Sequence, residues 1–309
     1  MRILFWGTPD FSVPSLRALD DEGHEIVGVV TQPDRPAGRG RKLTPSPVRE
    51  AAEAMGFPVL TPERPRGDDF LARIRALGPE LSVVVAYGHI LRREVLDVPP
   101  LGSFNVHASL LPALRGAAPI NWAIARGLDI TGVTIMRMVE AMDAGPILHR
   151  IAEPILPDET ASELSHRLSE LGAEALVEAL ALMAAGQARE EEQDHALATL
   201  APKVGRDVAR LDWSRSAPEI ARLIRGMDDV PGAWSELEGS PIKLFRPRVV
   251  EGAGAPAGTV VTADAPGGLV VAAGSGALSL GEVQPPGKRR MDAQDWIHGR
   301  GVRAGQRFT

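Results

Sequence analysis

Three polar side chains in the middle of the chain have the types and spacing that acyl transfer requires. Asn105 and His107 stand two residues apart, and Asp143 follows the next apolar segment. A neutral imidazole can accept or donate a proton, and a carboxylate close to it fixes its tautomer. An amide N–H can stabilise a developing oxyanion. The three groups indicate acyl transfer to an incoming amine without a covalent serine intermediate, because no G-x-S-x-G motif surrounds Ser109.

The strands expected to position these groups are residues 102–107 and 132–138. Residues two apart on a strand point to the same face, so the amide and the imidazole should project together. The end of such a strand is where ligands bind in open α/β sheets. A helix near 118–127 and a right-handed crossover would set the second strand alongside the first and bring the carboxylate to the imidazole. The alternatives are a His–Asn pair that only caps backbone groups and an aspartate that only forms a turn.

The surrounding elements predict a parallel sheet covered on both faces, followed by a smaller β domain. The expected strands are 2–6, 26–30 and 81–86, and the expected helices are 10–21, 47–55, 69–77 and 160–186. We therefore expect a catalytic domain at 1–186 and a polar linker at 187–203. A helix near 217–227 and short strands between Gly/Pro turns favour a small barrel or sandwich at 204–309.

Length and composition exclude several classes of protein. The 309 residues suggest about two domains. Cysteine is absent, which excludes a Cys nucleophile, a thiolate metal site and a disulfide framework. Without a long apolar run or a secretory leader, the chain is expected to be cytoplasmic and to have no membrane contact. The turn Gly7-Thr8-Pro9-Asp10 lacks the glycine fingerprint of a dinucleotide site, and no Walker A sequence occurs.

Longer stretches of the sequence resemble the methionyl-tRNA formyltransferase family. The resemblance covers nearly the whole chain, and the order and spacing of the matching stretches agree throughout. These stretches are Gly7-Thr8-Pro9-Asp10-Phe11, Thr31-Gln32-Pro33-Asp34-Arg35-Pro36-Ala37-Gly38-Arg39-Gly40, Val83-Val84-Val85-Ala86-Tyr87-Gly88, Asn105 to Pro112, Arg115-Gly116-Ala117-Ala118-Pro119-Ile120, Gly132-Val133-Thr134-Ile135-Met136, Met142-Asp143-Ala144-Gly145 and Gln284-Pro285-Pro286-Gly287-Lys288.

The resemblance implies a Rossmann-like formyltransferase domain with a mostly parallel sheet, followed by a small OB-like barrel that binds tRNA. It implies 10-formyltetrahydrofolate as the formyl donor and gives Asn105, His107 and Asp143 the catalytic positions. The implied folate contacts are Ser109, Leu110, Leu111 and Pro112, together with Tyr87, Gly88, His89, Ile90, Leu91 and Val139. Residues that depart from those frequent in the family are His89, Ala113-Leu114 and Asp228-Asp229-Val230.

Two basic clusters are candidates for contact with tRNA. The net charge is -6, but residues 204–309 hold 14 Lys and Arg against 12 Asp and Glu. Guanidinium groups pair well with phosphates, and the resemblance implies that Arg39 contacts the acceptor end of initiator methionyl-tRNA. The first cluster is Arg35, Arg39, Arg41 and Lys42 in the loop 33–46, and the second is Lys288, Arg289 and Arg290. The alternatives are a flexible surface loop and a solvated turn.

These features predict direct formyl transfer that supports translation initiation, by a monomer that needs no metal. The α-amine of methionyl-tRNA would attack the formyl carbon, and Asn105 and His107 would stabilise the oxyanion of the tetrahedral intermediate. Asp143 would hold His107 and assist the movement of the proton. Two alternatives remain open. One is a formyltransferase for the amine of a sugar nucleotide, which should lack the basic loop at 33–46, and the other is a non-catalytic RNA-binding protein with a degenerate transferase domain.

Overall fold

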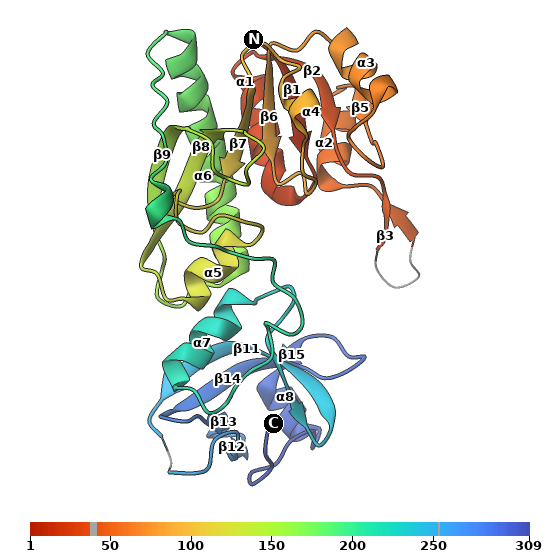
Figure 1. Cartoon of the computed structure of the whole chain (residues 1–309). Coiled ribbons are helices and arrows are strands. Elements are labelled where there is room, and N and C mark those ends of the chain that lie inside the picture. Colours follow the sequence, from red (N-terminus) through yellow and green to blue (C-terminus); the bar gives the residue numbers. More distant parts are fainter. Residues whose placement is uncertain (38–41, 253) are drawn as a thin grey trace. The chain divides into compact units, whose positions relative to one another are not determined.

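The computed structural model describes residues 1–37, 42–252 and 254–309, and the chain forms two compact units (Figure 1). The first unit contains residues 1–116, 130–154 and 165–200, and the second contains residues 117–129, 155–164 and 201–309. The chain passes between the units several times. Residues 187–200, in the expected linker, lie in the first unit.

The first unit is built on a seven-stranded sheet in which the central strand β6 lies between β1 and β7 (Figure 1). In the order of the sheet, the strands are β5 (Val59–Leu60), β2 (Glu25–Val30), β1 (Arg2–Gly7), β6 (Leu81–Val85), β7 (Ser103–His107), β8 (Ile130–Arg137) and β9 (Ile147–Pro154). The first five of these strands are parallel to one another. The predicted Rossmann-like fold with a mostly parallel sheet is therefore confirmed.

The strand β8 lies beside β7 as expected, but the two strands are antiparallel, with His107 opposite Thr134. The predicted right-handed crossover is therefore wrong. The helix after β7, α5 (Pro119–Ala125), belongs to the second unit, where its Asn121 donates to the carbonyl of Gly226. The segment between β7 and β8 therefore does not return the chain to the start of β7. The chain therefore re-enters the sheet in the opposite direction.

Helices and a small hairpin complete the first unit. They are α1 (Val13–Asp21), α2 (Pro47–Ala54), α3 (Asp68–Ala76), α4 (Arg93–Leu96), α6 (Ala161–Ala184, which begins in the second unit), the 3-10 turns at 10–12 and 195–197, and the pair β3 (Arg35–Ala37) and β4 (Lys42–Thr44). The α3 residues Phe70 and Ile74 pack with Leu4, Trp6 and Val84 of the sheet in one core. This burial of apolar surface stabilises the part of the sheet formed by β1 and β6.

The second unit contains a curled antiparallel sheet with helices beside it. Its elements are α5, α7 (Ala217–Gly226), α8 (Ala293–His298), β10 (Trp234–Leu237), β11 (Ser240–Val250), β12 (Val260–Asp264), β13 (Gly268–Ala272), β14 (Ala277–Gln284) and β15 (Met291–Asp292). The strand order is β10-β11-β14-β13-β12, and β15 pairs with β14. The last residues of the chain connect the two edges of the sheet. Phe308 pairs with Leu237 of β10, and Arg307 pairs with Thr259, which precedes β12. This closure is what the predicted OB-like barrel requires.

No helix in the described ranges combines the length and the apolar character that a membrane span needs.

Candidate active site

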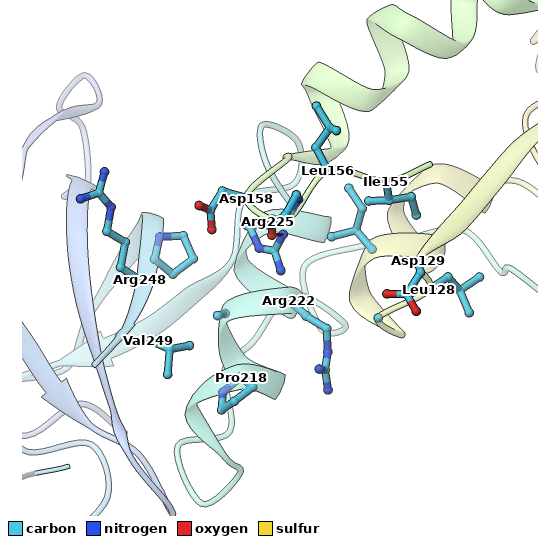
Figure 2. Close-up of a pocket in the computed structure, with 15 residues that line it drawn as sticks. Leu128, Asp129, Ile155, Leu156, Asp158, Pro218, Arg222, Arg225, Arg248 and Val249 are labelled. Atoms are coloured by element: carbon cyan, nitrogen blue, oxygen red, sulfur yellow. Dashed lines mark hydrogen bonds between the residues drawn. The ribbon is translucent and has the colours of Figure 1, made fainter. Parts of the chain in front are cut away.

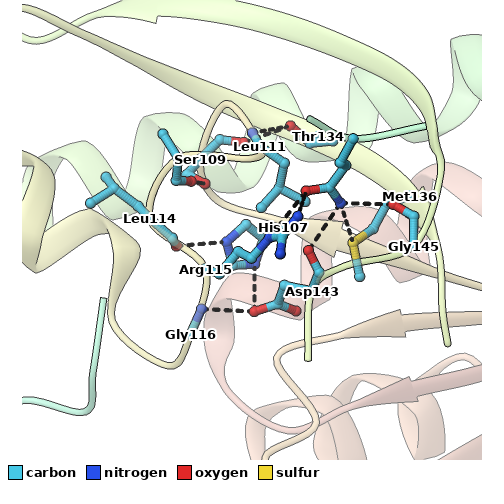
Figure 3. Close-up of polar contacts among 12 residues, drawn as sticks. His107, Ser109, Leu111, Leu114, Arg115, Gly116, Thr134, Met136, Asp143 and Gly145 are labelled. Atoms are coloured by element: carbon cyan, nitrogen blue, oxygen red, sulfur yellow. Dashed lines mark hydrogen bonds and ion pairs between the residues drawn. The ribbon is translucent and has the colours of Figure 1, made fainter. Parts of the chain in front are cut away.

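His107 ends β7 and is buried, and one of its ring nitrogens is held by the main chain. Its Nε2 lies 3.0 Å from the carbonyl oxygen of Leu114. Because a carbonyl only accepts, this contact assigns the proton of the neutral imidazole to Nε2. The other nitrogen, Nδ1, faces Asp143, with 3.8 Å between Nδ1 and Oδ2 (Figure 3). Nδ1 is therefore the atom at which the ring can take up a proton.

Asp143 lies in the loop 138–146, which joins β8 to β9, and a main-chain amide holds its carboxylate. The N–H of Gly116 donates to Oδ2 at 2.8 Å (Figure 3). The separation of 3.8 Å from His107 is longer than a direct hydrogen bond, and catalytic contacts are often long before substrate binds. The pair can therefore stabilise a protonated imidazole by charge and can pass a proton to or from a group that enters between them.

Asn105 stands on the same face of β7 as His107 and is partly exposed. Its side-chain amide has no hydrogen-bond partner among the residues that the structure describes. A partly exposed amide without a protein partner can donate to the oxygen of a bound molecule. In the same described ranges, no group of three or more His, Asp or Glu side chains is arranged to hold a metal ion.

Backbone strain in the first unit is concentrated around this site. In its described part, the non-glycine residues with positive φ are Ala86 (φ 46°), Leu114 (φ 60°) and Asp143 (φ 49°). Such a conformation costs about 1–3 kcal/mol and persists only where the surrounding structure fixes it. Ala86 follows β6, and the carbonyl of Leu114 contacts His107. Strain at these positions is typical of a functional site.

The expected folate segment at 109–112 is attached to β8 by the hydroxyl of Thr134 (Figure 3). This hydroxyl donates to the carbonyl of Ser109 at 2.7 Å and accepts from the amide of Leu111 at 3.1 Å. The Ser109 side chain is fully buried and donates to the carbonyl of Ala113 at 2.6 Å, so it is used inside the protein. In this segment Leu111 is buried, and Leu110 and Pro112 are partly exposed.

The side chain of Tyr87 lies in the core, where its ring packs against Trp6 with 5.3 Å between centroids. Burial raises the pKa of the Tyr87 hydroxyl above its ordinary range. The carbonyl of Tyr87 accepts from the hydroxyl of Thr8 at 3.0 Å and from the amide of Gln32 at 2.8 Å. Tyr87 therefore anchors the segment 87–91 in the core, and the residues that a ligand can contact are those that follow it.

Residues 88–90 line a pocket of about 590 Å³ with a mainly basic rim. Its lining is Glu63, Arg64, Pro65, Arg66, Gly88, His89, Ile90 and Arg92. Ile90 is 80% exposed, whereas the next residue, Leu91, returns to the core. Val139, on the loop that carries Asp143, is also exposed. The pocket offers apolar surface beside cationic groups, which suits a flat ligand with carboxylates.

A second pocket, of about 540 Å³, lies in the second unit beside α7 (Figure 2). Arg222, Arg225, Asp129 and Asp158 are among the charged residues that line it. Arg225 donates to the carbonyl of Pro157, and burial lowers the pKa of its guanidinium. Charges of both signs line this pocket, and none of the three candidate catalytic residues does.

The residues expected to contact tRNA are only partly described. Arg39 and Arg41 lie outside the described residues, and the side chain of Lys42 is not described either. Arg35 is exposed on β3 and donates to the side-chain oxygen of Gln32. Lys288 and Arg289 are exposed in the turn between β14 and β15.

Arg290 has structural partners that its sequence context does not indicate. Its guanidinium donates to both carboxylate oxygens of Asp228, at 2.9 and 3.3 Å, and also to Glu282. It lies over the ring of Phe245, 3.9 Å from the centroid. The predicted phosphate contact of Arg290 would therefore compete with these acidic partners in the second unit. The pairing also gives a role to Asp228, one of the departures from the family pattern.

Replacing Arg290 by Met is expected to lower the free energy of unfolding by about 3 kcal/mol, because Asp228 would remain buried without its cation. The matched change, Asp228→Asn, should not lower the free energy of unfolding at neutral pH, since Arg290 keeps Glu282. Urea titrations monitored by tryptophan fluorescence measure both effects. An Arg290→Met variant that keeps its stability and loses tRNA affinity would instead support the phosphate contact.

The same pair makes a prediction about pH. Burial raises the pKa of Asp228 above its ordinary value of 3.8, in spite of Arg290. The folded state therefore binds this proton more tightly than the unfolded state, and the stability that protonation contributes is lost as pH rises through the raised pKa. Asp228→Asn should thus equal the parent in stability below pH 3.8 and be at least as stable above the raised pKa. A variant that is less stable only at neutral pH would contradict this direction.

Sequence reasoning missed the side chain of Gln193, which is buried in this site. Its amide nitrogen donates to the carbonyls of Asp143 and Gly145, and its amide oxygen accepts from Arg115. A single polar residue in a polar segment carries no signal of such a role. The amide of Gly116 and the carbonyl of Leu114 were missed for a similar reason, since main-chain groups have no signature in residue type.

Comparisons with known proteins identify the family of this chain. The formyl transferase family matches residues 1–180, and the formyl transferase C-terminal domain matches residues 203–301. The methionyl-tRNA formyltransferases of Desulfotalea psychrophila and Symbiobacterium thermophilum are each 49% identical to this chain, over 97% and 100% of it and over 93% and 95% of their own lengths. The crystal structure of HypX from Aquifex aeolicus in complex with tetrahydrofolic acid has a similar fold, with a TM-score of 0.67 and 20% identity over 96% of this chain, which spans 47% of that longer protein. The chain belongs to the methionyl-tRNA formyltransferase family of enzymes.

Proposed function

We propose that the protein transfers the formyl group of 10-formyltetrahydrofolate to the α-amino group of initiator methionyl-tRNA. The observation that carries the proposal is the arrangement of Asn105, His107 and Asp143. A ring nitrogen of His107 faces the carboxylate of Asp143, and the amide of Asn105 on the same strand has no hydrogen-bond partner in the described part of the chain. Relatives at 49% identity are methionyl-tRNA formyltransferases. The tetrahydrofolic acid in the HypX complex supports a folate donor.

The donor supplies an activated formyl carbon, and the residues of this chain handle the charge and the proton. Asn105 donates to the oxygen that becomes negative as the amine attacks. His107, protonated at Nδ1 or donating from it, stabilises the same oxygen, and the carboxylate of Asp143 favours the charged ring. Asp143 then assists the proton of the amine to reach N10 of the donor. One C–N bond forms, one C–N bond breaks, and no covalent bond to the protein is needed.

We assign the glutamate end of the donor to the basic pocket at 88–90. Arg64, Arg66 and Arg92 line it next to residues of the implied folate segment. Guanidinium groups make charge-assisted hydrogen bonds with carboxylates, and folates carry carboxylates on their glutamate. The exposed Ile90 would cover part of the donor between this end and the reacting carbon.

Replacing Arg64 and Arg92 together by Ala is expected to raise the KM for the donor about tenfold and to leave kcat unchanged. A charge-assisted hydrogen bond contributes about 1.5–3 kcal/mol, and exposure of both side chains reduces this figure. Initial rates at several donor concentrations measure the effect. The control is Arg73→Ala with Arg75→Ala, which removes the same charge from α3. An equal rise in KM for a donor analogue without glutamate would contradict the assignment.

The test of the function itself is a formylation assay with charged initiator tRNA and an amino-sugar nucleotide as competing acceptors. Formylation of the tRNA, with rates that fall as salt rises, supports the proposal, because phosphate contacts are salt-dependent. The expected contacts are Arg35, Arg39, Arg41, Lys42, Lys288, Arg289 and Arg290. Transfer only to the sugar amine, or tRNA binding without transfer, would reject it.

A further inference from the structure

Gln193 connects the two backbone segments between which the carboxylate of Asp143 is held. It is 5% exposed, and it lies 50 residues after Asp143 in the sequence. One segment, at 143–145, carries the carboxylate. The other, at 115–116, supplies the amide that donates to it. The catalytic proposal above gives Gln193 no role, so its burial and contacts call for an explanation.

All four hydrogen-bonding positions of the Gln193 amide are occupied. Nε2 donates to the carbonyls of Asp143 at 2.9 Å and Gly145 at 2.7 Å. Oε1 accepts from Nε and Nη2 of Arg115, at 3.1 and 2.6 Å. Arginine can only donate and a carbonyl can only accept, so this orientation of the amide is the one that satisfies both sides. No other uncharged side chain of this length offers two donors and two acceptor positions in this arrangement.

Further contacts anchor Gln193 itself. Glu191 forms two main-chain hydrogen bonds with Ile147 of β9, both at 2.8 Å. Arg150 pairs with Glu191 at 2.9 Å, and Arg137 pairs with Glu190. The segment 190–193 is therefore an addition to the edge of the sheet, and it presents its glutamine at a fixed position. A loosely held chain could not set the position of a second loop in this way.

We infer that Gln193 is a positioning residue for the formyl transfer, acting through Asp143. Asp143 adopts φ 49°, which costs about 1–3 kcal/mol for a residue other than glycine. The two bonds from Nε2 hold the main chain in that conformation, and the bonds to Arg115 hold the neighbouring Gly116 amide at the carboxylate. A displacement of about 1 Å at a catalytic group can lower the rate by about 100-fold. The inference rests on the proposed function, since it assumes that Asp143 acts in the reaction.

Two substitutions separate positioning from packing. Gln193→Glu fills the same volume and keeps the contact with Arg115, but it sets an acceptor against the carbonyls of Asp143 and Gly145. Gln193→Ala removes both sets of contacts. Gln294→Ala is the control, because the amide nitrogen of Gln294 also donates to a main-chain carbonyl, that of Ala265, at 3.1 Å in the second unit.

Kinetics with methionyl-tRNA and 10-formyltetrahydrofolate should show kcat reduced about 10- to 100-fold in both Gln193 variants, with the KM for tRNA within about twofold of the parent. Hydrogen exchange should show faster exchange of the amides in the loop 138–146 in both variants. Gln294→Ala should change neither. A Gln193→Glu variant with parental kcat, or with unchanged exchange in that loop, would overturn the inference.

The two readouts also keep this inference separate from the proposed function. If the parent enzyme fails to formylate methionyl-tRNA, the proposed function is rejected, and the exchange of the loop 138–146 still decides whether Gln193 holds it. If the parent enzyme is active and both Gln193 variants keep its kcat, only the role of Gln193 is rejected.

Discussion

Replacing His107 by Gln is expected to lower kcat by about 10³-fold, the middle of the range for a lost general acid–base group. The amide of the new side chain can still donate to the carbonyl of Leu114, which His107 contacts at 3.0 Å. The buried position therefore stays satisfied, and the loss reports on the ring nitrogen that faces Asp143. Single-turnover formylation with saturating donor and charged tRNA measures the chemical step directly.

The chain offers a matched control for this change. His149 of β9 also pairs with a carboxylate, at 2.7 Å from Glu178, and it is not one of the three candidate catalytic residues. His149→Gln should keep the parental kcat. Near-parental turnover for His107→Gln and His107→Ala would remove the imidazole from the mechanism.

Asp143→Asn is expected to lower kcat by about 10²- to 10³-fold at nearly unchanged stability. Asparagine has the same shape, its side-chain oxygen can accept from the Gly116 amide, and it tolerates positive φ well. What it lacks is the negative charge that favours a protonated imidazole and the ability to take a proton from the amine. The measurement is kcat together with the midpoint of thermal unfolding.

Asp264→Asn is the control for this second change. Asp264 also accepts a hydrogen bond from a main-chain amide, that of Gly267 at 2.7 Å, but it lies in the second unit. It should alter neither kcat nor the unfolding midpoint by much. If Asp143→Asn keeps more than about a tenth of the parental kcat, the charge of Asp143 is not needed for the reaction.

The sequence was sufficient to identify the catalytic candidates because their types contrast with their surroundings. Asn105 and His107 interrupt an apolar strand, and the predicted strand 102–107 agrees with β7. The contact between His107 and Asp143 was also predicted, but for a reason that proved wrong. The geometry of a crossover depends on where the intervening helix packs, and α5 packs in the second unit, which no local pattern reveals.

Two other features could not be predicted from the local sequence. Arg290 was predicted to contact tRNA, and its pairing with Asp228 was missed, since Asp228 stands 62 positions earlier and nothing nearby in the sequence indicates the pair. Gln193 lies among charged residues that predict a linker, and only the edge pairing with β9 brings it into the site. Both side chains acquire their roles from tertiary contacts between distant segments.

The loop 138–146 closes at its base, because the amide of Arg137 donates to the carbonyl of Pro146 at 2.9 Å. A loop that is closed in this way can change in length at a cost of only about 0.6 kcal/mol per doubling, without disturbing the strands on either side. Residues 139–142 are exposed, whereas Asp143 is tied down by Gly116 and Gln193. Residues 139–142 could therefore be replaced by a shorter or longer segment while the carboxylate of Asp143 keeps its position.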